Sequence, residues 1–346
     1  MDIAIGIFII ALGAFCQSSC YVPINKIKEW SWESYWIIQG VFAWLLLPLL
    51  GAFLAVPEGH NLSELFLEGS NSFNIAMTIF FGVLWGIGGL TFGLSMRYLG
   101  VALGQSIALG TCAGLGTVMG PVFLNIFFPE QDPLASLTFS VIIGVVVTLV
   151  GIAIIGVAGS MKASTLSEEE KKKAVKDFNF PKGLIIALLA GFMSGCFNVG
   201  LNFGNGLNFG ELTDPMFRTL PATFLVTFGG FFTNAIYCLA QNQKNGTWGD
   251  YAKKEVWTNN IIFCALAGAL WYSQFFGLSL GQGFLKDSPT MMTLSFCILM
   301  ALNVTFSNVW GIILKEWKGC SRATILVLLL GISVLILSSF LQQLIG

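Results

Sequence analysis

Ten long apolar segments run through this chain and constrain its fold more than any other feature. A helix needs about 20 apolar residues to cross the roughly 30 Å hydrocarbon core of a bilayer. Only 10% of the 346 residues are charged, whereas about 25% is usual in a soluble domain. The sequence therefore predicts an all-α polytopic membrane protein with ten transmembrane helices. We place them at residues 3–22, 35–56, 74–95, 101–127, 138–158, 182–204, 219–241, 258–282, 291–314 and 323–345.

The basic residues predict which loops face the cytoplasm. Fifteen of the 17 lie in loops that follow odd-numbered helices, whereas the other loops hold only Arg218 and Lys286. The fifteen are Lys26, Lys28, Arg97, Lys162, Lys171, Lys172, Lys173, Lys176, Lys182, Lys244, Lys253, Lys254, Lys315, Lys318 and Arg322. Because basic loops stay on the cytoplasmic side of a membrane, we expect both termini on the outer side.

One polar segment divides the predicted helices into two groups of five. Residues 161–181 contain the run SEEEKKKAVKD, which is far richer in charge than the rest of the chain. We expect this segment to be a cytoplasmic linker between an N-terminal half, 1–160, and a C-terminal half, 182–346. A group of five helices crosses the membrane an odd number of times, so a duplicated copy would be inverted.

Two sequence matches between the halves indicate such a duplication. The run IIALGAFCQSSC at 9–20 and the run IIALLAGFMSGC at 185–196 share seven residues in register. A weaker match aligns the segment around Trp85 with the segment around Trp271. Both matches join helices that are five apart, so the sequence predicts two inverted five-helix repeats. Inverted repeats with a substrate site near the bilayer midplane are typical of secondary transporters.

Missing motifs exclude several other classes of protein. The sequence has no Walker-type phosphate-binding loop and no CxxC pair, and His60 is its single histidine. An ATP-driven pump, a metal-dependent hydrolase and a disulfide framework are therefore disfavoured. We expect no cofactor and no metal ion. The formal net charge of −1 also gives no reason to expect a nucleic-acid partner.

Amide side chains inside the apolar segments are the best candidates for contacting a solute. They are Gln17, Gln39, Gln105, Asn198, Asn202, Asn234, Gln274, Asn303 and Asn308. An unpaired amide is unfavourable in lipid, so each is expected to face a cavity or another helix. Amides both donate and accept hydrogen bonds, which suits sugar hydroxyls, whereas a cationic drug would call for a buried carboxylate. The competing interpretation is that most of these amides simply join neighbouring helices.

Two tryptophans and two carboxylates complete the set of candidates. Trp85 and Trp271 lie within spans at matching repeat positions, and a flat ring can pack on the apolar face of a pyranose. Tryptophans near span ends, Trp36 among them, fit an interfacial aromatic belt instead. Glu33 and Asp214 lie at predicted helix ends and are candidates for carrying a proton. The alternative for both is a helix N-terminal carboxylate stabilised by the helix dipole.

Several runs resemble the L-rhamnose/proton symporter family. They are YVPINKIKEWSWESYW at 21–36, LWGIGGLTFGLSMRYLGVALGQSIALG at 84–110, LWYSQFFGLSLG at 270–281 and ILKEW at 313–317. The resemblance extends over nearly the whole chain. It implies a drug/metabolite transporter superfamily fold of ten helices in two inverted repeats. It also implies import of L-rhamnose with a proton across the bacterial inner membrane, so that the outer side predicted for both termini from the basic loops is the periplasm.

We therefore expect a secondary active transporter that imports L-rhamnose or a close 6-deoxyhexose by proton symport and alternating access. The residues expected to bind the sugar are Gln17, Trp85, Asn198, Asn202, Trp271, Gln274 and Asn303. Glu33 or Asp214 is expected to carry the proton. The expected partners are the sugar, the proton and the lipid bilayer.

Other functions remain open at this point. One alternative is an exporter of metabolites or amphipathic drugs from the same superfamily. Another is a sensor or membrane scaffold that binds a partner through residues 161–181. An enzyme is disfavoured because the sequence shows no nucleophile together with its base.

Overall fold

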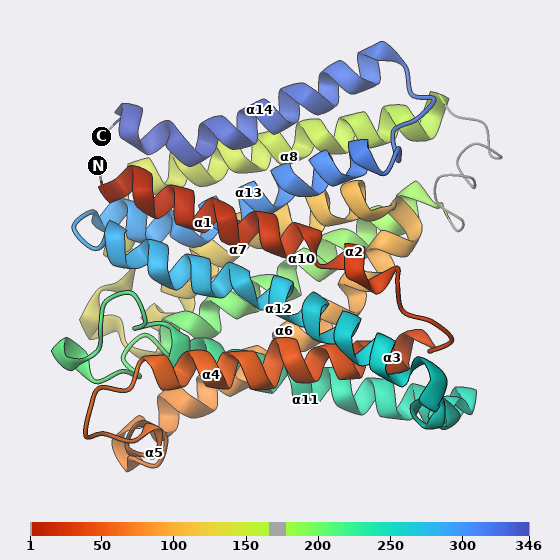
Figure 1. The fold of residues 1–346 in the computed structure, drawn as a ribbon. Coiled ribbons are helices and arrows are strands. Elements are labelled where there is room, and N and C mark those ends of the chain that lie inside the picture. Colours follow the sequence, from red (N-terminus) through yellow and green to blue (C-terminus); the bar gives the residue numbers. More distant parts are fainter. Residues whose placement is uncertain (1, 166–177, 346) are drawn as a thin grey trace. The chain divides into compact units, whose positions relative to one another are not determined.

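The computed structural model describes residues 2–165 and 178–345, and the regular structure of these residues is helical (Figure 1). The helices of the apolar segments are α1 (Asp2–Ser19), α3 (Trp32–Gly40), η1 (Val41–Leu46), α4 (Leu47–Leu54), α6 (Ser72–Leu99), α7 (Val101–Phe127), α8 (Phe139–Thr165), α10 (Phe180–Phe203), α11 (Leu220–Asn245), α12 (Lys254–Leu285), α13 (Pro289–Ile313) and α14 (Arg322–Ile345). Shorter turns are α2 (Tyr21–Ile24), α5 (Leu62–Phe66), η2 (Gly69–Asn71), η3 (Pro129–Gln131), η4 (Pro133–Ser136), η5 (Gly210–Leu212) and η6 (Thr247–Ala252). The prediction of an all-α chain is confirmed for these residues.

Nine helical segments in the described part of the chain are long and apolar enough to cross a membrane. They are Asp2–Ile24, Trp32–Leu54, Ser72–Leu99, Ser106–Phe127, Phe139–Lys162, Phe180–Phe203, Leu220–Asn245, Lys254–Leu285 and Pro289–Ile313. A further apolar helical segment, Arg322–Ser338, is shorter. These segments support a multi-pass membrane protein, while the number of ten spans stays a prediction.

The ends of the helices differ from the predicted ends for one main reason. Helix α8 continues to Thr165, beyond the predicted end at 158, and α12 begins at Lys254 rather than at 258. Hydropathy detects the part of a helix that lies in lipid, whereas backbone hydrogen bonds continue through polar turns outside it. Helix α5 has five residues and is too short to produce a hydropathy signal.

A wide helical turn interrupts the second predicted span. Residues Val41–Leu46 form a π-helix between α3 and α4, and the Leu47 N–H donates to the Phe42 carbonyl oxygen, five residues earlier. Pro48 follows directly and is buried. A proline has no N–H to donate, and its ring collides with the carbonyl four residues before it in an α-helix. The wider turn relieves that collision, so Pro48 accounts for the position of η1.

The chain folds into two compact units, each built from segments distant in sequence. Unit 1 comprises Met1–Ile87 with Gly200–Phe284, and unit 2 comprises Gly88–Val199 with Leu285–Gly346. Each unit draws helices from both predicted halves. The two units are defined by which helices pack together, whereas the predicted repeats are defined by sequence similarity. The units therefore do not test the repeats, and the two five-helix repeats stay a prediction. Of the predicted linker, residues 166–177 lie outside the described part of the chain.

In unit 1, glycines allow α6 and α11 to approach closely. A Cβ atom on Gly82 would lie 2.2 Å from the Val226 carbonyl oxygen, and one on Gly229 would lie 2.3 Å from the Ile79 carbonyl oxygen. Thr233 Oγ1 donates a 3.0 Å hydrogen bond to the Val83 carbonyl oxygen across the same crossing. Small residues permit this approach because dispersion and interhelical hydrogen bonds, rather than exclusion of water, hold helices together in lipid.

Replacing Gly229 with alanine tests how tight this crossing is. We expect Gly229→Ala to lower the free energy of unfolding by about 1–3 kcal/mol, because the new methyl group would push α11 away from α6. Gly156 in α8 is the control, since a Cβ atom there meets no atom of the described residues within 4 Å. Gly156→Ala should leave stability unchanged or raise it, because alanine is the better helix former. Chemical unfolding of the purified protein in detergent measures both, and equal effects would contradict the tight crossing.

Candidate functional site

Three tryptophans from three helices of unit 1 pack against one another. Trp44 lies in η1, Trp85 in α6 and Trp271 in α12. The ring centroid of Trp44 is 6.0 Å from that of Trp85 and 6.0 Å from that of Trp271, and the last two are 5.7 Å apart. We call these three residues the tryptophan cluster. The structure brings the two predicted tryptophans together and adds Trp44, which the repeat pattern does not single out.

The π-helix and nearby glycines position the cluster. A Cβ atom on Gly268 of α12 would lie 3.0 Å from the Ala43 nitrogen, so α12 packs directly against η1. Cβ atoms on Gly40 and Gly230 would lie 2.6 Å from the Trp44 ring and 2.2 Å from the Trp85 ring. The glycines therefore provide the space in which the large rings meet.

Trp36 extends the aromatic packing toward the start of α3. Its ring centroid lies 5.7 Å from that of Trp44 and 5.2 Å from that of Trp32. Trp36 is buried, so the aromatic-belt interpretation is wrong for this residue. Its Nε1 donates a 2.9 Å hydrogen bond to Asn234 Oδ1, and Asn234 Nδ2 donates to the carbonyl oxygens of Gly86 and Gly230. Asn234 thus joins helices, as the competing interpretation of the amides holds.

Two of the predicted amides lie beside the cluster. Gln274 is buried in α12, and its Nε2 donates a 3.1 Å hydrogen bond to the Trp271 carbonyl oxygen. Gln17 is buried in α1, which runs antiparallel to α12 with Gly13 against Gly277 and Gly6 against Gly281. This register brings Gln17, one turn beyond Gly13, to the level of the turn that holds Trp271.

The remaining predicted amides are distributed over both units. Asn202 is half-buried near the end of α10 and belongs to unit 1. Asn198 and Asn303 belong to unit 2. Asn198 Nδ2 donates a 2.9 Å hydrogen bond to the Gly116 carbonyl oxygen and joins α10 to α7. Asn303 is fully buried in α13, with its Nδ2 4.0 Å from the Met300 sulfur. Their roles in binding stay predictions.

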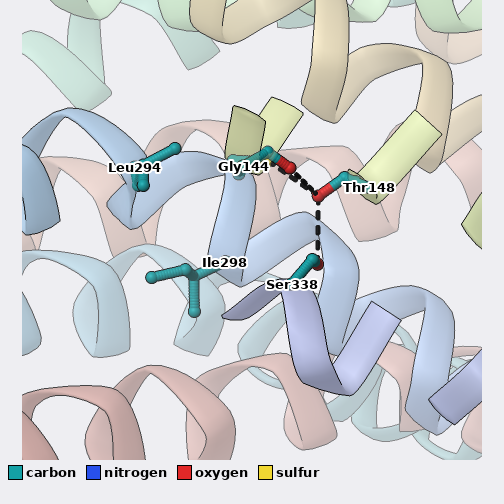
Figure 2. Close-up of a pocket in the computed structure, with 6 residues that line it drawn as sticks. Gly144, Thr148, Leu294, Ile298 and Ser338 are labelled. Atoms are coloured by element: carbon teal, nitrogen blue, oxygen red, sulfur yellow. Dashed lines mark hydrogen bonds between the residues drawn. The ribbon is translucent and has the colours of Figure 1, made fainter. Parts of the chain in front are cut away.

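Unit 2 contains a narrow crevice, shown in Figure 2. It is lined by Gly144, Thr148, Leu294, Cys297, Ile298 and Ser338. Thr148 Oγ1 lies 3.0 Å from the Gly144 carbonyl oxygen and 3.0 Å from the Ser338 hydroxyl. Helices α8 and α14 run side by side here (Figure 1). Because the polar groups bind one another, we assign this crevice to helix packing.

The two predicted proton carriers have opposite environments. Glu33 lies in the first turn of α3 and is only 6% exposed. Its Oε1 accepts 2.9 Å hydrogen bonds from Asn245 Nδ2 and Thr247 Oγ1, both uncharged donors. Asp214 is exposed in the loop before α11, where its Oδ1 accepts a hydrogen bond from the Met216 N–H. Shielding from water therefore distinguishes Glu33 from Asp214.

A second buried carboxylate, Asp250 in η6, caps the start of α3. Its Oδ2 accepts 2.7 Å hydrogen bonds from the Ser31 N–H and hydroxyl and a 2.9 Å bond from the Ser34 hydroxyl. Its Oδ1 forms a 2.8 Å ion pair with Lys253. Burial raises the pKa of the Asp250 carboxyl, but the hydrogen bonds from Lys253, Ser31 and Ser34 outweigh it and hold that pKa at about 2.

Asn242 connects the two carboxylates. Its Nδ2 lies 2.9 Å from the Ser34 hydroxyl, which binds Asp250, and 3.0 Å from the Thr247 hydroxyl, which binds Glu33. We call Glu33, Ser34, Asn242, Thr247 and Asp250 the carboxylate network. Ser31 and Asp250 are 219 residues apart in sequence. The spacing of residues along the chain therefore does not predict the carboxylate network.

Comparison with known proteins identifies the family. The family model described as L-rhamnose-proton symport protein (RhaT) matches residues 1–345. L-rhamnose-proton symporters from Citrobacter koseri and Yersinia pestis are both 31% identical to this chain, and each alignment covers 97% of this chain and 96% of the relative. The chain belongs to the L-rhamnose-proton symport protein family. The predicted family is thus confirmed, and membership in a symport-protein family places the chain among multi-pass transport proteins rather than enzymes.

In this symport-family chain, removing the Asp250 carboxylate should weaken the fold. We expect Asp250→Ala to lower the free energy of unfolding by roughly 1–2 kcal/mol, because the start of α3 loses its cap and Lys253 loses its acceptor. Chemical unfolding at neutral pH measures the loss. Asp287→Ala, at an exposed position, is the control and should change little. An equal effect of the two substitutions would show that the cap does not stabilise α3.

The same carboxylate predicts a pH dependence of stability. The pKa of Asp250 in the folded protein is about 2, below its ordinary value of 3.8. The charged form therefore stabilises the fold above the ordinary value, and this contribution is lost as the pH falls toward about 2. Unfolding curves between pH 5 and pH 2 should show a steeper loss of stability for the wild type than for Asp250→Asn. Parallel pH profiles would contradict the assignment.

Proposed function

We propose that this chain imports L-rhamnose, or a close 6-deoxyhexose, by proton symport through alternating access. The observation that carries the proposal is the 31% identity to L-rhamnose-proton symporters over 97% of this chain. Proteins that align over almost their whole length share the elements that form a solute pathway. We further propose that the protein lies in a bacterial inner membrane with ten spans in two inverted repeats of the drug/metabolite transporter superfamily. Both termini are then periplasmic, in agreement with the basic loops.

The tryptophan cluster supports a sugar as the solute. One face of a 6-deoxyhexose is largely C–H, and its methyl group adds apolar surface, so both suit packing on indole rings. Gln17 and Gln274 lie close by and can bond hydroxyls. The rings of Trp85 and Trp271 are in contact in this conformation, with centroids 5.7 Å apart. Under this proposal the rings separate when the sugar enters.

Uptake into proteoliposomes tests both the solute and the coupling. With the purified protein reconstituted, radiolabelled L-rhamnose should accumulate when the external buffer is more acidic than the interior. A protonophore should abolish that accumulation, and protein-free liposomes supply the background. Uptake indifferent to the gradient would refute proton coupling, whereas absence of any L-rhamnose flux would refute the solute.

We propose that Glu33, rather than Asp214, carries the proton. A coupling carboxyl must be shielded from water in one state and reach it in another, so that its affinity for the proton changes during the cycle. Glu33 is buried among neutral donors, whereas Asp214 is already exposed to solvent.

Neutral isosteres of the two carboxylates separate these roles. Glu33→Gln should abolish pH-gradient-driven accumulation while preserving exchange of labelled for unlabelled L-rhamnose, because exchange needs no net proton movement. Asp214→Asn is the matched control and should retain both activities. The assignment is reversed if only Asp214→Asn loses accumulation, and neither residue is the carrier if both variants accumulate sugar normally.

A further inference from the structure

Four buried polar atoms in unit 1 have no hydrogen-bond partner among the residues that the structure describes: Trp30 Nε1, in the loop before α3, and three atoms of residues within helices. The three are Gln39 Oε1, Trp44 Nε1 and the Tyr272 hydroxyl. These three residues are 2%, 3% and 1% exposed, respectively. A buried polar group without a partner is strongly unfavourable in hydrocarbon, where water does not compensate. Asn234 in the same unit, by contrast, binds Trp36, Gly86 and Gly230.

The three atoms belong to one seam between two helical spans. The seam is formed by α3, η1 and α4 on one side and by α12 on the other. A Cβ atom on Gly268 of α12 would lie 3.1 Å from the Gln39 carbonyl oxygen, which brings the turn of Gln39 against α12. Trp44 packs on Trp271 of α12. A Cβ atom on Gly51 of α4 would lie 2.7 Å from the Tyr272 hydroxyl oxygen.

The three groups have the mixed chemistry of a hydroxyl-binding surface. Gln39 Oε1 accepts a hydrogen bond, Trp44 Nε1 donates one, and the Tyr272 hydroxyl does both. A cation would leave the indole N–H unpaired, and an anion would be repelled by the amide oxygen. A neutral solute with several hydroxyls suits all three groups chemically, because each hydroxyl both donates and accepts. Two members of the tryptophan cluster, Trp44 and Trp271, lie on the same seam and offer the apolar faces that pack on a sugar ring.

We propose that Gln39, Trp44 and Tyr272 bind sugar hydroxyls, and that the sugar ring packs on the tryptophan cluster beside them. This inference rests on the proposed function and assigns it a set of residues. The π-turn at Val41–Leu46 lies in the middle of the seam, between Gln39 and Gly51. Such turns occur often at functional sites, and under this inference the seam opens here to admit the sugar.

The test removes one hydroxyl oxygen and compares binding with stability. Tyr272→Phe should weaken L-rhamnose binding, measured by calorimetry on the purified protein, about 5- to 10-fold, as expected for the loss of one hydrogen bond. The unfolding temperature of the sugar-free variant should stay the same or rise, because the deleted oxygen has no partner there. The increase in unfolding temperature caused by sugar should shrink accordingly. Gln39→Leu should likewise bind L-rhamnose more weakly, while its sugar-free form should unfold at the same temperature as the wild type or at a higher one.

Tyr237→Phe is the matched control, since Tyr237 is an exposed tyrosine of α11 in the same unit. It should change neither the affinity nor the unfolding temperature. L-rhamnose analogues that each lack one hydroxyl sharpen the test. One analogue should bind the wild type more weakly, and Tyr272→Phe should cause no further loss with that analogue.

The outcomes separate this inference from the function on which it rests. If the wild type binds and transports L-rhamnose, and Tyr272→Phe and Gln39→Leu bind it unchanged, the seam holds water or closes by packing and the inference is wrong. If the sugar-free variants unfold at lower temperature than the wild type, the groups are structural and the inference is again wrong. If the wild type does not bind L-rhamnose, the proposed function fails. In that case a set of neutral hexoses and polyols that gives no increase in unfolding temperature overturns the seam assignment as well.

Discussion

In hydrocarbon, a polar atom must find its hydrogen-bond partner within the protein, because no water is present to supply one. This constraint makes the described backbone helical, and it also shapes the departures from regular helix. Pro48 removes one N–H from the second span, and the backbone responds with the π-turn Val41–Leu46. Hydroxyls inside the helices follow the same rule, as when Thr117 and Thr227 donate to carbonyl oxygens four residues earlier.

Buried polar groups that have hydrogen-bond partners therefore indicate a different role from those that have none. Asn234 uses both ends of its amide to hold three helices together, which is a structural role. Gln39, Trp44 and Tyr272 leave polar atoms without a partner in the described residues, although they lie in the same unit. A helical membrane protein tolerates such atoms where another state or a ligand satisfies them. The burial of these atoms beside a cluster of tryptophans is what points to a sugar.

The carboxylate network and the tryptophan cluster are joined by α3. The network holds the first turn of α3 through Glu33, Ser34 and the cap from Asp250, and the cluster begins at the other end of this helix with Trp44. Trp36 lies between them and packs on Trp44. Under the proposed function, a change of protonation at Glu33 alters the hydrogen bonds that fix the start of α3. Coupling between proton and sugar then requires movement of this one helical segment, which contains the π-turn Val41–Leu46.

The sequence predicts several residues of the candidate site, but it does not reveal all the residues that contact them. The match between the halves pairs Trp85 with Trp271 inside apolar spans, and the structure brings the two rings into contact. The same reasoning does not reveal Trp44 as their third neighbour, because contact depends on how each helix is rotated about its axis. It does not reveal Asp250 either, since the carboxylate reaches Ser31 from a loop 219 residues away.

The sequence by itself determined that the chain is a helical membrane protein and to which family it belongs. Hydropathy suffices for the first conclusion because lipid imposes a length and an apolar composition on every span. Only the tertiary structure decided which amides are satisfied and which remain without partners, and which carboxylate is shielded from water. Those properties depend on helix register and rotation, where a shift of one residue turns a side chain by about 100° and exchanges its neighbours.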